Sequence, residues 1–214
     1  MASHDAAVKK PVTSSRRLKQ TAFPHSPEVL LLVDVINPLD FPTAQDILPS
    51  AMEAAKAIAK LKARHTRRGM SCIYANDNYG TWHSEFRDIL AECCKLEGPR
   101  GEMALLLSPG PEDLVILKPQ HSAFHSTPLQ HLLTKMKAKK LIIVGLAADM
   151  CVMLTATDAR MLGYDVWVPK DCTAAESVLR KDNALQQLEG CSSVRCGPRT
   201  ASAADPPSVA QHKK

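Results

Sequence analysis

The sequence alternates between short apolar runs and longer segments with one apolar face, and this alternation restricts the fold more than any other feature. Residues 29–35 are almost entirely apolar, which is typical of a strand buried on both faces. Such runs predict strands at 29–35, 71–75, 114–117, 141–144 and 165–168, with a short last strand at 192–194. Amphipathic segments predict helices between Thr43 and Gly69, and at 84–95, 127–136, 151–162 and 176–188. Alternating strands and helices predict an α/β fold: a mostly parallel six-stranded sheet with helices on both faces, in three layers.

The length and charge distribution favour one folded domain between two polar ends. The 214 residues suffice for one domain with a sizeable core. We expect a flexible N-terminal arm at 1–27, the domain at 28–196 and a flexible tail at 197–214. Residues 1–20 contain five Lys or Arg and one acidic residue, and residues 197–214 contain three and one. The net charge of +5 therefore belongs to the ends, and we expect no binding to nucleic acid.

The sequence lacks the motifs of several other classes of protein. No apolar run approaches the roughly 20 residues that span a bilayer, and the N-terminus lacks the apolar core of a secretory signal. We therefore expect a cytoplasmic protein without a membrane segment; Ser14–Arg17 leave a mitochondrial transit peptide as the alternative. No GxGxxG or Walker A sequence follows a predicted strand, which argues against a nucleotide-dependent enzyme. None of the seven cysteines forms a CxxC pair.

Three reactive residues follow the ends of predicted strands. Asp34 ends the first strand, Lys118 follows the third, and Cys151 follows the fourth after a short turn. Because ligands bind beyond the carboxyl ends of parallel strands, the fold should bring these side chains to one edge of the sheet. Cys151 also opens a predicted helix, and the positive end of the helix dipole should lower the pKa of its thiol. The alternative for each residue is a structural or surface role.

Three segments carry a resemblance to a known family. Residues 31–37 (LLVDVIN), 117–124 (LKPQHSAF) and 145–152 (GLAADMCV) resemble the isochorismatase-like cysteine hydrolases, in the expected order and spacing. The similarity extends over roughly residues 28–195. It implies a Rossmann-like three-layer fold and an enzyme that hydrolyses small molecules.

The resemblance also implies roles for individual residues. Asp34 is expected to be the general base and acid, Lys118 its cationic partner and Cys151 the nucleophile. A cis peptide bond is expected between Leu146 and Ala147. That bond would aim the amides of Ala147 and Cys151 into an oxyanion hole.

The loop after the second predicted strand narrows the substrate. It reads Asn76-Asp77-Asn78-Tyr79-Gly80-Thr81-Trp82-His83, and Tyr79 stands where nicotinamidases carry a metal-binding histidine. The loop is instead similar to that of a bacterial branch of the family. One Asp and one His are too few for a closed metal site, so we predict no metal and no cofactor. The candidate substrate-binding residues are Asn37, Asn78, Tyr79, Trp82 and Phe124; for the aromatic residues the alternative is core packing.

These residues favour one reaction class and leave two alternatives open. A cysteine with a lysine and an aspartate favours hydrolysis of a small amide, ureide or carbamoyl compound through a thioester. The first alternative is hydrolysis of a vinyl ether, as in true isochorismatases, which do not need the cysteine. The second is a catalytically dormant binding protein on the same fold. We expect a small-molecule substrate and, by analogy with relatives, a homo-oligomer (a dimer or tetramer).

Overall fold

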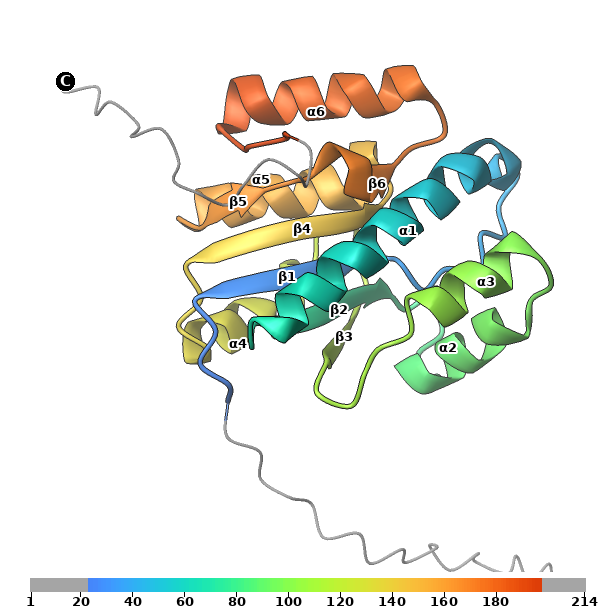
Figure 1. Ribbon diagram of the computed structural model, residues 1–214, viewed down its shortest axis with the longest axis horizontal. Coiled ribbons are helices and arrows are strands. Elements are labelled where there is room, and N and C mark those ends of the chain that lie inside the picture. The colour runs from blue at the N-terminus through green and yellow to red at the C-terminus, as the bar shows by residue number, and fades with distance from the viewer. Residues whose placement is uncertain (1–22, 198–214) are drawn as a thin grey trace, which may run out of the picture.

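The computed structural model describes residues 23–197, which form one parallel sheet between two layers of helices (Figure 1). The strand order is β3-β2-β1-β4-β5, and β6 pairs with β4. The strands are β1 (Glu28–Val33), β2 (Ser71–Asp77), β3 (Leu114–Lys118), β4 (Lys140–Leu146), β5 (Asp165–Trp167) and β6 (Thr173–Ala174). All pairings are parallel, so the carboxyl ends of the strands meet at one edge.

Helices cover both faces of the sheet, as the alternating pattern predicts. Side chains of α1, α2 and α3 pack in one core cluster, and those of α4, α5 and α6 in the other (Figure 1). The helices are α1 (Ala44–Arg67), α2 (Phe86–Lys95), α3 (Pro99–Leu106), α4 (Leu129–Lys135), α5 (Met153–Met161) and α6 (Val178–Ser192). Two short turns complete the described elements: the π-helical η1 (Ala148–Val152) and the 3₁₀ turn η2 (Lys170–Cys172). The predicted three-layer α/β fold is confirmed.

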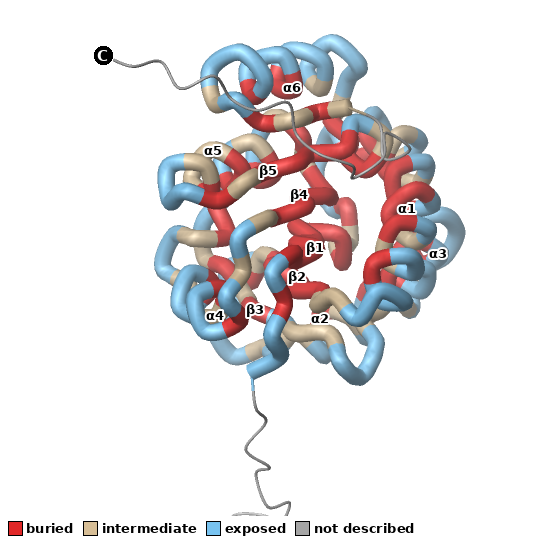
Figure 2. The backbone as a smooth tube through the Cα atoms, turned by 60° about the vertical axis from the view of Figure 1, so that its left-hand side comes forward, coloured by how far each residue is buried: buried red, intermediate tan, exposed pale blue. Residues whose placement is uncertain are grey.

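The central strand β1 supplies both cores. Its side chains alternate between the two faces: Leu30 and Leu32 join the α1 side, while Val29, Leu31 and Val33 join the α4–α5 side. Figure 2 shows most strand residues buried at the centre, with exposed residues on the outer sides of the helices. A strand buried on both faces explains the uninterrupted apolar run in the sequence.

Two predicted elements are wrong in detail, and one helix was not predicted. Residues 192–194 are not a strand: Ser192 ends α6, Ser193 is a left-handed cap with φ 51°, and the sixth strand is Thr173–Ala174. Arg195 forms only an isolated bridge with Trp167. The helix α3 was not predicted. The helix expected to begin at Cys151 begins at Met153, and Cys151 lies inside η1.

The end of the predicted 1–27 arm contacts the folded domain. Ser26 is buried, its amide donates to the carbonyl of Met136 (3.0 Å), and its hydroxyl accepts from the amide of Ser71 (2.9 Å). Contacts with the folded domain therefore include Ser26, before Glu28. Residues 1–22 of the arm and 198–214 of the tail lie outside the described residues. Within 23–197 no helix is long and apolar enough to cross a membrane.

Gly145 allows β4 to lie close to β1 just before the candidate nucleophile. Its φ is +122°, and an added Cβ would stand 1.9 Å from the carbonyl oxygen of Val33. A side chain at this position would therefore push the two strands apart. Asp34 follows Val33, and the turn with Cys151 follows Gly145, so this close approach sets the spacing of the site.

Candidate active site

The three predicted residues converge at the carboxyl edge of the sheet. Asp34 directly follows β1 and has a left-handed backbone (φ 49°), a conformation that aspartate tolerates better than most residues. Its amide donates to the carbonyl of Ala75 on β2 (3.0 Å), which fixes the turn. Lys118 is the last residue of β3, and Cys151 lies in η1 after β4.

Lys118 stands at the centre of the contacts. Its Nζ lies 2.9 Å from Oδ2 of Asp34 and 3.5 Å from Sγ of Cys151. The same ammonium group lies 3.7 Å from Oδ2 of Asp77 and donates to the carbonyl of Gln120 (3.2 Å). The lysine side chain is fully buried, with 0% of its surface exposed. Burial lowers the pKa of Lys118, but the negative charges of Asp34 and Asp77 raise it, and the pKa lies above its usual value. The buried lysine is therefore charged.

Asp34 is buried, and both of its carboxylate oxygens have partners. Only 4% of the residue is exposed, and Oδ1 accepts a hydrogen bond from the amide of Asp77 (2.7 Å). Burial raises the pKa of Asp34, while the charge of Lys118 and a hydrogen bond with Cys151 act in the opposite direction. A carboxylate with a raised pKa beside a thiol is suited to accept and return its proton.

The predicted lowering of the Cys151 pKa is wrong. Burial, followed by the negative charge of Asp34, raises the pKa of the thiol to about 12, and Lys118 offsets this only in part. The helix dipole does not lower this pKa, because Cys151 lies within a buried π-helical turn ahead of α5. The resting thiol is therefore protonated near neutral pH, and a base has to take its proton when it reacts.

The turn before Cys151 has the backbone geometry that the family resemblance implies. The peptide bond between Leu146 and Ala147 is cis. The amides of Met150 and Val152 both donate to the carbonyl of Ala147 (3.1 and 3.2 Å). Neither bond uses the amides of Ala147 or Cys151, which are the expected oxyanion donors.

Two polar residues of the site were missed by the sequence analysis. Asp77 ends β2 beside Lys118, its register partner on β3, and adds a second carboxylate near the ammonium group. His121 places Nδ1 3.6 Å from Sγ of Cys151. The strand-end rule that identified Asp34 also applies to Asp77, whereas His121 lies in a loop whose path the sequence does not give.

The two candidate asparagines hold the loops around the site. Oδ1 of Asn37 accepts from the amide of Leu39 (2.8 Å), and Oδ1 of Asn78 accepts from the amide of Gly80 (3.0 Å). Tyr79 donates its hydroxyl to the carbonyl of Ile36 (3.1 Å), and burial raises its pKa. The two asparagine bonds each lie within one loop, and the Tyr79 bond joins the loop after β2 to the loop after β1. Binding of substrate by these residues stays a prediction.

The two other aromatic candidates have different surroundings. Phe124 packs partly buried against the core and stacks on Tyr164 with ring centroids 6.1 Å apart, so core packing describes it best. Trp82 is 77% exposed, which contradicts core packing for this residue. The alternative of core packing therefore fits Phe124 and not Trp82, and binding of substrate by either ring stays a prediction.

Metal ligands do not gather at this edge in the part of the chain that the structure describes. Among residues 23–197, no group of three or more His, Cys, Asp and Glu side chains is arranged to hold a metal ion. The residues that surround Cys151 instead form a chain of charged and hydrogen-bonding groups.

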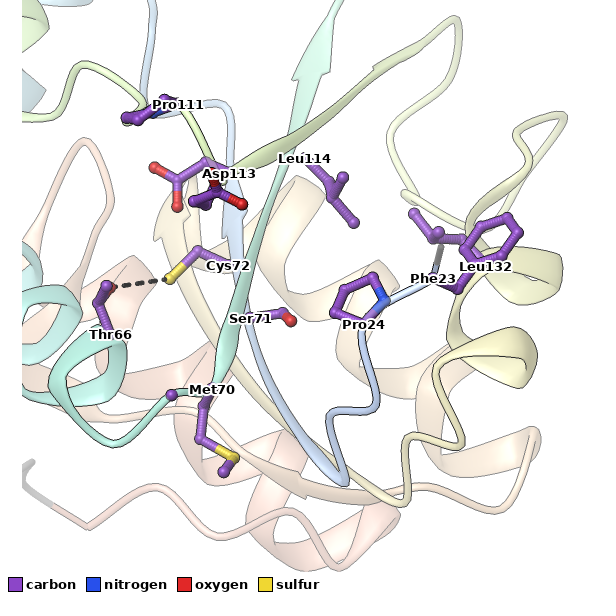
Figure 3. Close-up of a pocket in the computed structure, with 12 residues that line it drawn as sticks. Phe23, Pro24, Thr66, Met70, Ser71, Cys72, Pro111, Asp113, Leu114 and Leu132 are labelled. Atoms are coloured by element: carbon purple, nitrogen blue, oxygen red, sulfur yellow. Dashed lines mark hydrogen bonds between the residues drawn. The ribbon is translucent and has the colours of Figure 1, made fainter. Parts of the chain in front are cut away.

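A separate cavity of about 660 Å³ lies at the opposite edge of the sheet (Figure 3). It is lined by the first residues of β2 and β3, including Ser71, Cys72 and Leu114, and by Phe23 and Pro24. Because β2 has seven residues, this edge lies about 20 Å from the end that carries Asp77. The thiol of Cys72, whose pKa burial raises to about 11, is far from the convergent site.

Comparison with known proteins assigns the family. The sequence matches the family model described as "Isochorismatase domain" over residues 28–199, which is most of the chain. The chain belongs to the isochorismatase family. The family protein YaaI of Bacillus subtilis is 33% identical over 162 residues, covering 76% of this chain and 88% of that protein.

Relatives with named activities are similar to this chain in one of two ways. Some match its sequence over a shorter stretch, and others match its fold alone. Ureidoacrylate amidohydrolase RutB of an Enterobacter strain is 40% identical over 67 residues, covering 31% of this chain and 29% of RutB. The crystal structure of N-carbamoylsarcosine amidase from Thermoplasma acidophilum superposes with a TM-score of 0.65. It is 23% identical, and the match covers 82% of this chain and 98% of the amidase. Both names describe hydrolysis of C–N bonds.

Proposed function

We propose that this isochorismatase-family protein is a metal-independent cysteine hydrolase of a small amide, ureide or carbamoyl compound. The observation that carries the proposal is the contact of Lys118 with both Asp34 (2.9 Å) and Cys151 (3.5 Å) in a buried cluster. A base, a cation and a thiol within hydrogen-bonding distance are what nucleophilic attack on a carbonyl requires. The amidohydrolases among the relatives support this reaction class.

The first half of the proposed reaction forms a thioester. Sγ of Cys151 bonds to the carbonyl carbon while Asp34 accepts the thiol proton. The carbonyl oxygen becomes an oxyanion, held by the amides of Ala147 and Cys151. The C–N bond then breaks, and Asp34 passes the proton to the leaving nitrogen. Water hydrolyses the thioester in the second half.

The raised pKa of the Cys151 thiol means that its proton has to be removed during the reaction. A resting thiol with a pKa of about 12 forms little thiolate by itself at neutral pH. Proton transfer to Asp34 therefore has to accompany attack, and Lys118 stabilises the negative charge that moves between carboxylate and sulfur. Burial of the cluster strengthens these interactions by excluding water.

A release screen tests this function. Purified protein in EDTA buffer is incubated with a panel of small amides, ureides and carbamoyl compounds, and ammonia or amine is measured. We expect turnover of at least one panel member, and the Cys151→Ala protein should fall to the blank level because the thioester cannot form. Circular dichroism of the Cys151→Ala protein serves as the folding control.

Four results would contradict the proposal in different ways. Equal turnover by the Cys151→Ala protein would exclude the nucleophile. Activity lost in EDTA and restored by a divalent metal would exclude metal independence. No release from any panel member, with hydrolysis of a vinyl ether instead, would favour the isochorismate-type reaction, and binding without hydrolysis would favour a dormant site.

A further inference from the structure

His121 lies on the solvent side of the candidate nucleophile. Its Nδ1 is 3.6 Å from Sγ of Cys151, and the residue itself is exposed. Asp34 and Lys118 reach the same region from the buried side, with 4% and 0% of their surfaces exposed. The thiol therefore stands between a buried acid–base pair and an exposed imidazole.

The loop that carries His121 is anchored on α5. The amide of Ala123 donates to Oγ1 of Thr155 (3.0 Å), and the hydroxyl of Ser122 donates to Oδ2 of Asp158 (2.5 Å). Thr155 and Ala123 are fully buried. These bonds fix the two residues that follow His121, so the position of the imidazole beside the sulfur is set by the packing of the loop.

Asp34 is poorly placed to serve the second half of the reaction alone. Oδ1 accepts from the amide of Asp77 (2.7 Å) and Oδ2 pairs with Lys118 (2.9 Å). Water for hydrolysis has to arrive from solvent, where His121 lies and the carboxylate does not. The family resemblance makes Asp34 the general base and acid of the site, but the exposed imidazole has the better access to this water.

We infer that His121 is a catalytic base of deacylation, an inference that rests on the proposed thioester at Cys151. In this step the imidazole Nδ1 accepts a proton from water as the water oxygen bonds to the thioester carbon. The C–S bond then breaks, and the imidazolium returns the proton to Sγ across the observed contact. The products are the carboxylic acid and the free thiol, so protons and electrons balance.

The experiment separates the two half-reactions with p-nitrophenyl acetate. Release of p-nitrophenolate reports acylation, later steady turnover reports deacylation, and intact-protein mass reports acetylated enzyme. In the His121→Gln protein we expect a burst of about one equivalent, steady turnover lower by about 10²-fold, and acetyl groups accumulating on Cys151. His125→Gln is the matched control, since His125 is an exposed histidine of the same loop, and it should behave like wild type.

Each outcome decides between named possibilities. Steady turnover that is unchanged in His121→Gln, or a burst slowed by the same factor as turnover, would overturn the role in deacylation while leaving the nucleophile intact. Absence of acetylation at Cys151 in both the wild type and His121→Gln, or a burst that survives Cys151→Ala, would instead overturn the proposed function.

Discussion

The Asp34→Asn protein is expected to lose turnover by about 10²- to 10⁴-fold while its Cys151 becomes more reactive toward alkylation. Turnover falls because the amide cannot accept the thiol proton. Reactivity rises because both the charge of Asp34 and its hydrogen bond raise the pKa of the thiol, and the substitution removes the charge while Lys118 remains. Each unit by which the pKa falls increases the thiolate fraction about tenfold at a fixed pH below that pKa.

Iodoacetamide labelling at pH 8, followed by peptide mapping, measures the reactivity of Cys151, which is compared with the turnover of the same protein. Cys191 is an exposed cysteine of the same chain and serves as the internal standard, since its labelling rate should not depend on residue 34. Retained turnover would show that Asp34 is not the base. Slower labelling of Cys151 would show that the carboxylate stabilises the thiolate, contrary to the direction of the pKa derived from the structure.

The Lys118→Met protein is expected to lose about 3–5 kcal/mol of unfolding free energy at pH 8, together with its activity. Methionine preserves most of the side-chain volume but leaves Asp34 as a buried carboxylate without its cation. The cost arises from the uncompensated charge rather than from the value of the ion pair itself. The double variant Asp34→Asn/Lys118→Met should therefore recover part of the loss.

The pH dependence of this loss has a definite sign. Removing Lys118 raises the pKa of Asp34 further above its unfolded value, because the charge that lowers it is absent. A raised folded-state pKa means that stability is present below the unfolded pKa and is lost as pH rises through the folded pKa. The deficit of Lys118→Met relative to wild type should thus be smaller at pH 5 than at pH 8.

Urea unfolding of the wild type and variants at both pH values provides the measurement. Lys95→Met is the control, because Lys95 pairs with Glu92 on the surface, where ion pairs contribute little. A Lys118→Met protein as stable as wild type at pH 8, or one whose deficit grows toward pH 5, would contradict a buried charged pair.

The sequence predicts where the catalytic candidates lie because they stand at or after the carboxyl ends of predicted strands. In a parallel sheet these ends meet at one edge, where ligands bind. Runs buried on both faces identify β1, which Asp34 follows, and β4, which the turn with Cys151 follows, whereas Lys118 ends the partly exposed edge strand β3. Very short strands are not predicted, because a strand of two residues such as Thr173–Ala174 shows no periodicity. The helix α3 did carry a signal, since Gly98 precedes it and Pro99 occupies its first position.

The chemistry of individual groups was harder to predict than their location. The thiol pKa depends on burial and on the distance to Asp34, and both are tertiary properties that a helix-start pattern does not contain. The contact of His121 with Cys151 depends on a loop anchored through Thr155 and Asp158. The exposure of Trp82 likewise depends on how its loop leaves β2.

The covalent thioester is tested most directly by partition of the acyl group between water and hydroxylamine. An amide substrate from the release screen and an ester with the same acyl group are each hydrolysed with hydroxylamine present, and the ratio of hydroxamate to acid is measured. A common thioester on Cys151 predicts the same ratio from both substrates, after subtraction of the Cys151→Ala blank. Ratios that differ between the two substrates would contradict the account, because water would then attack the substrate itself.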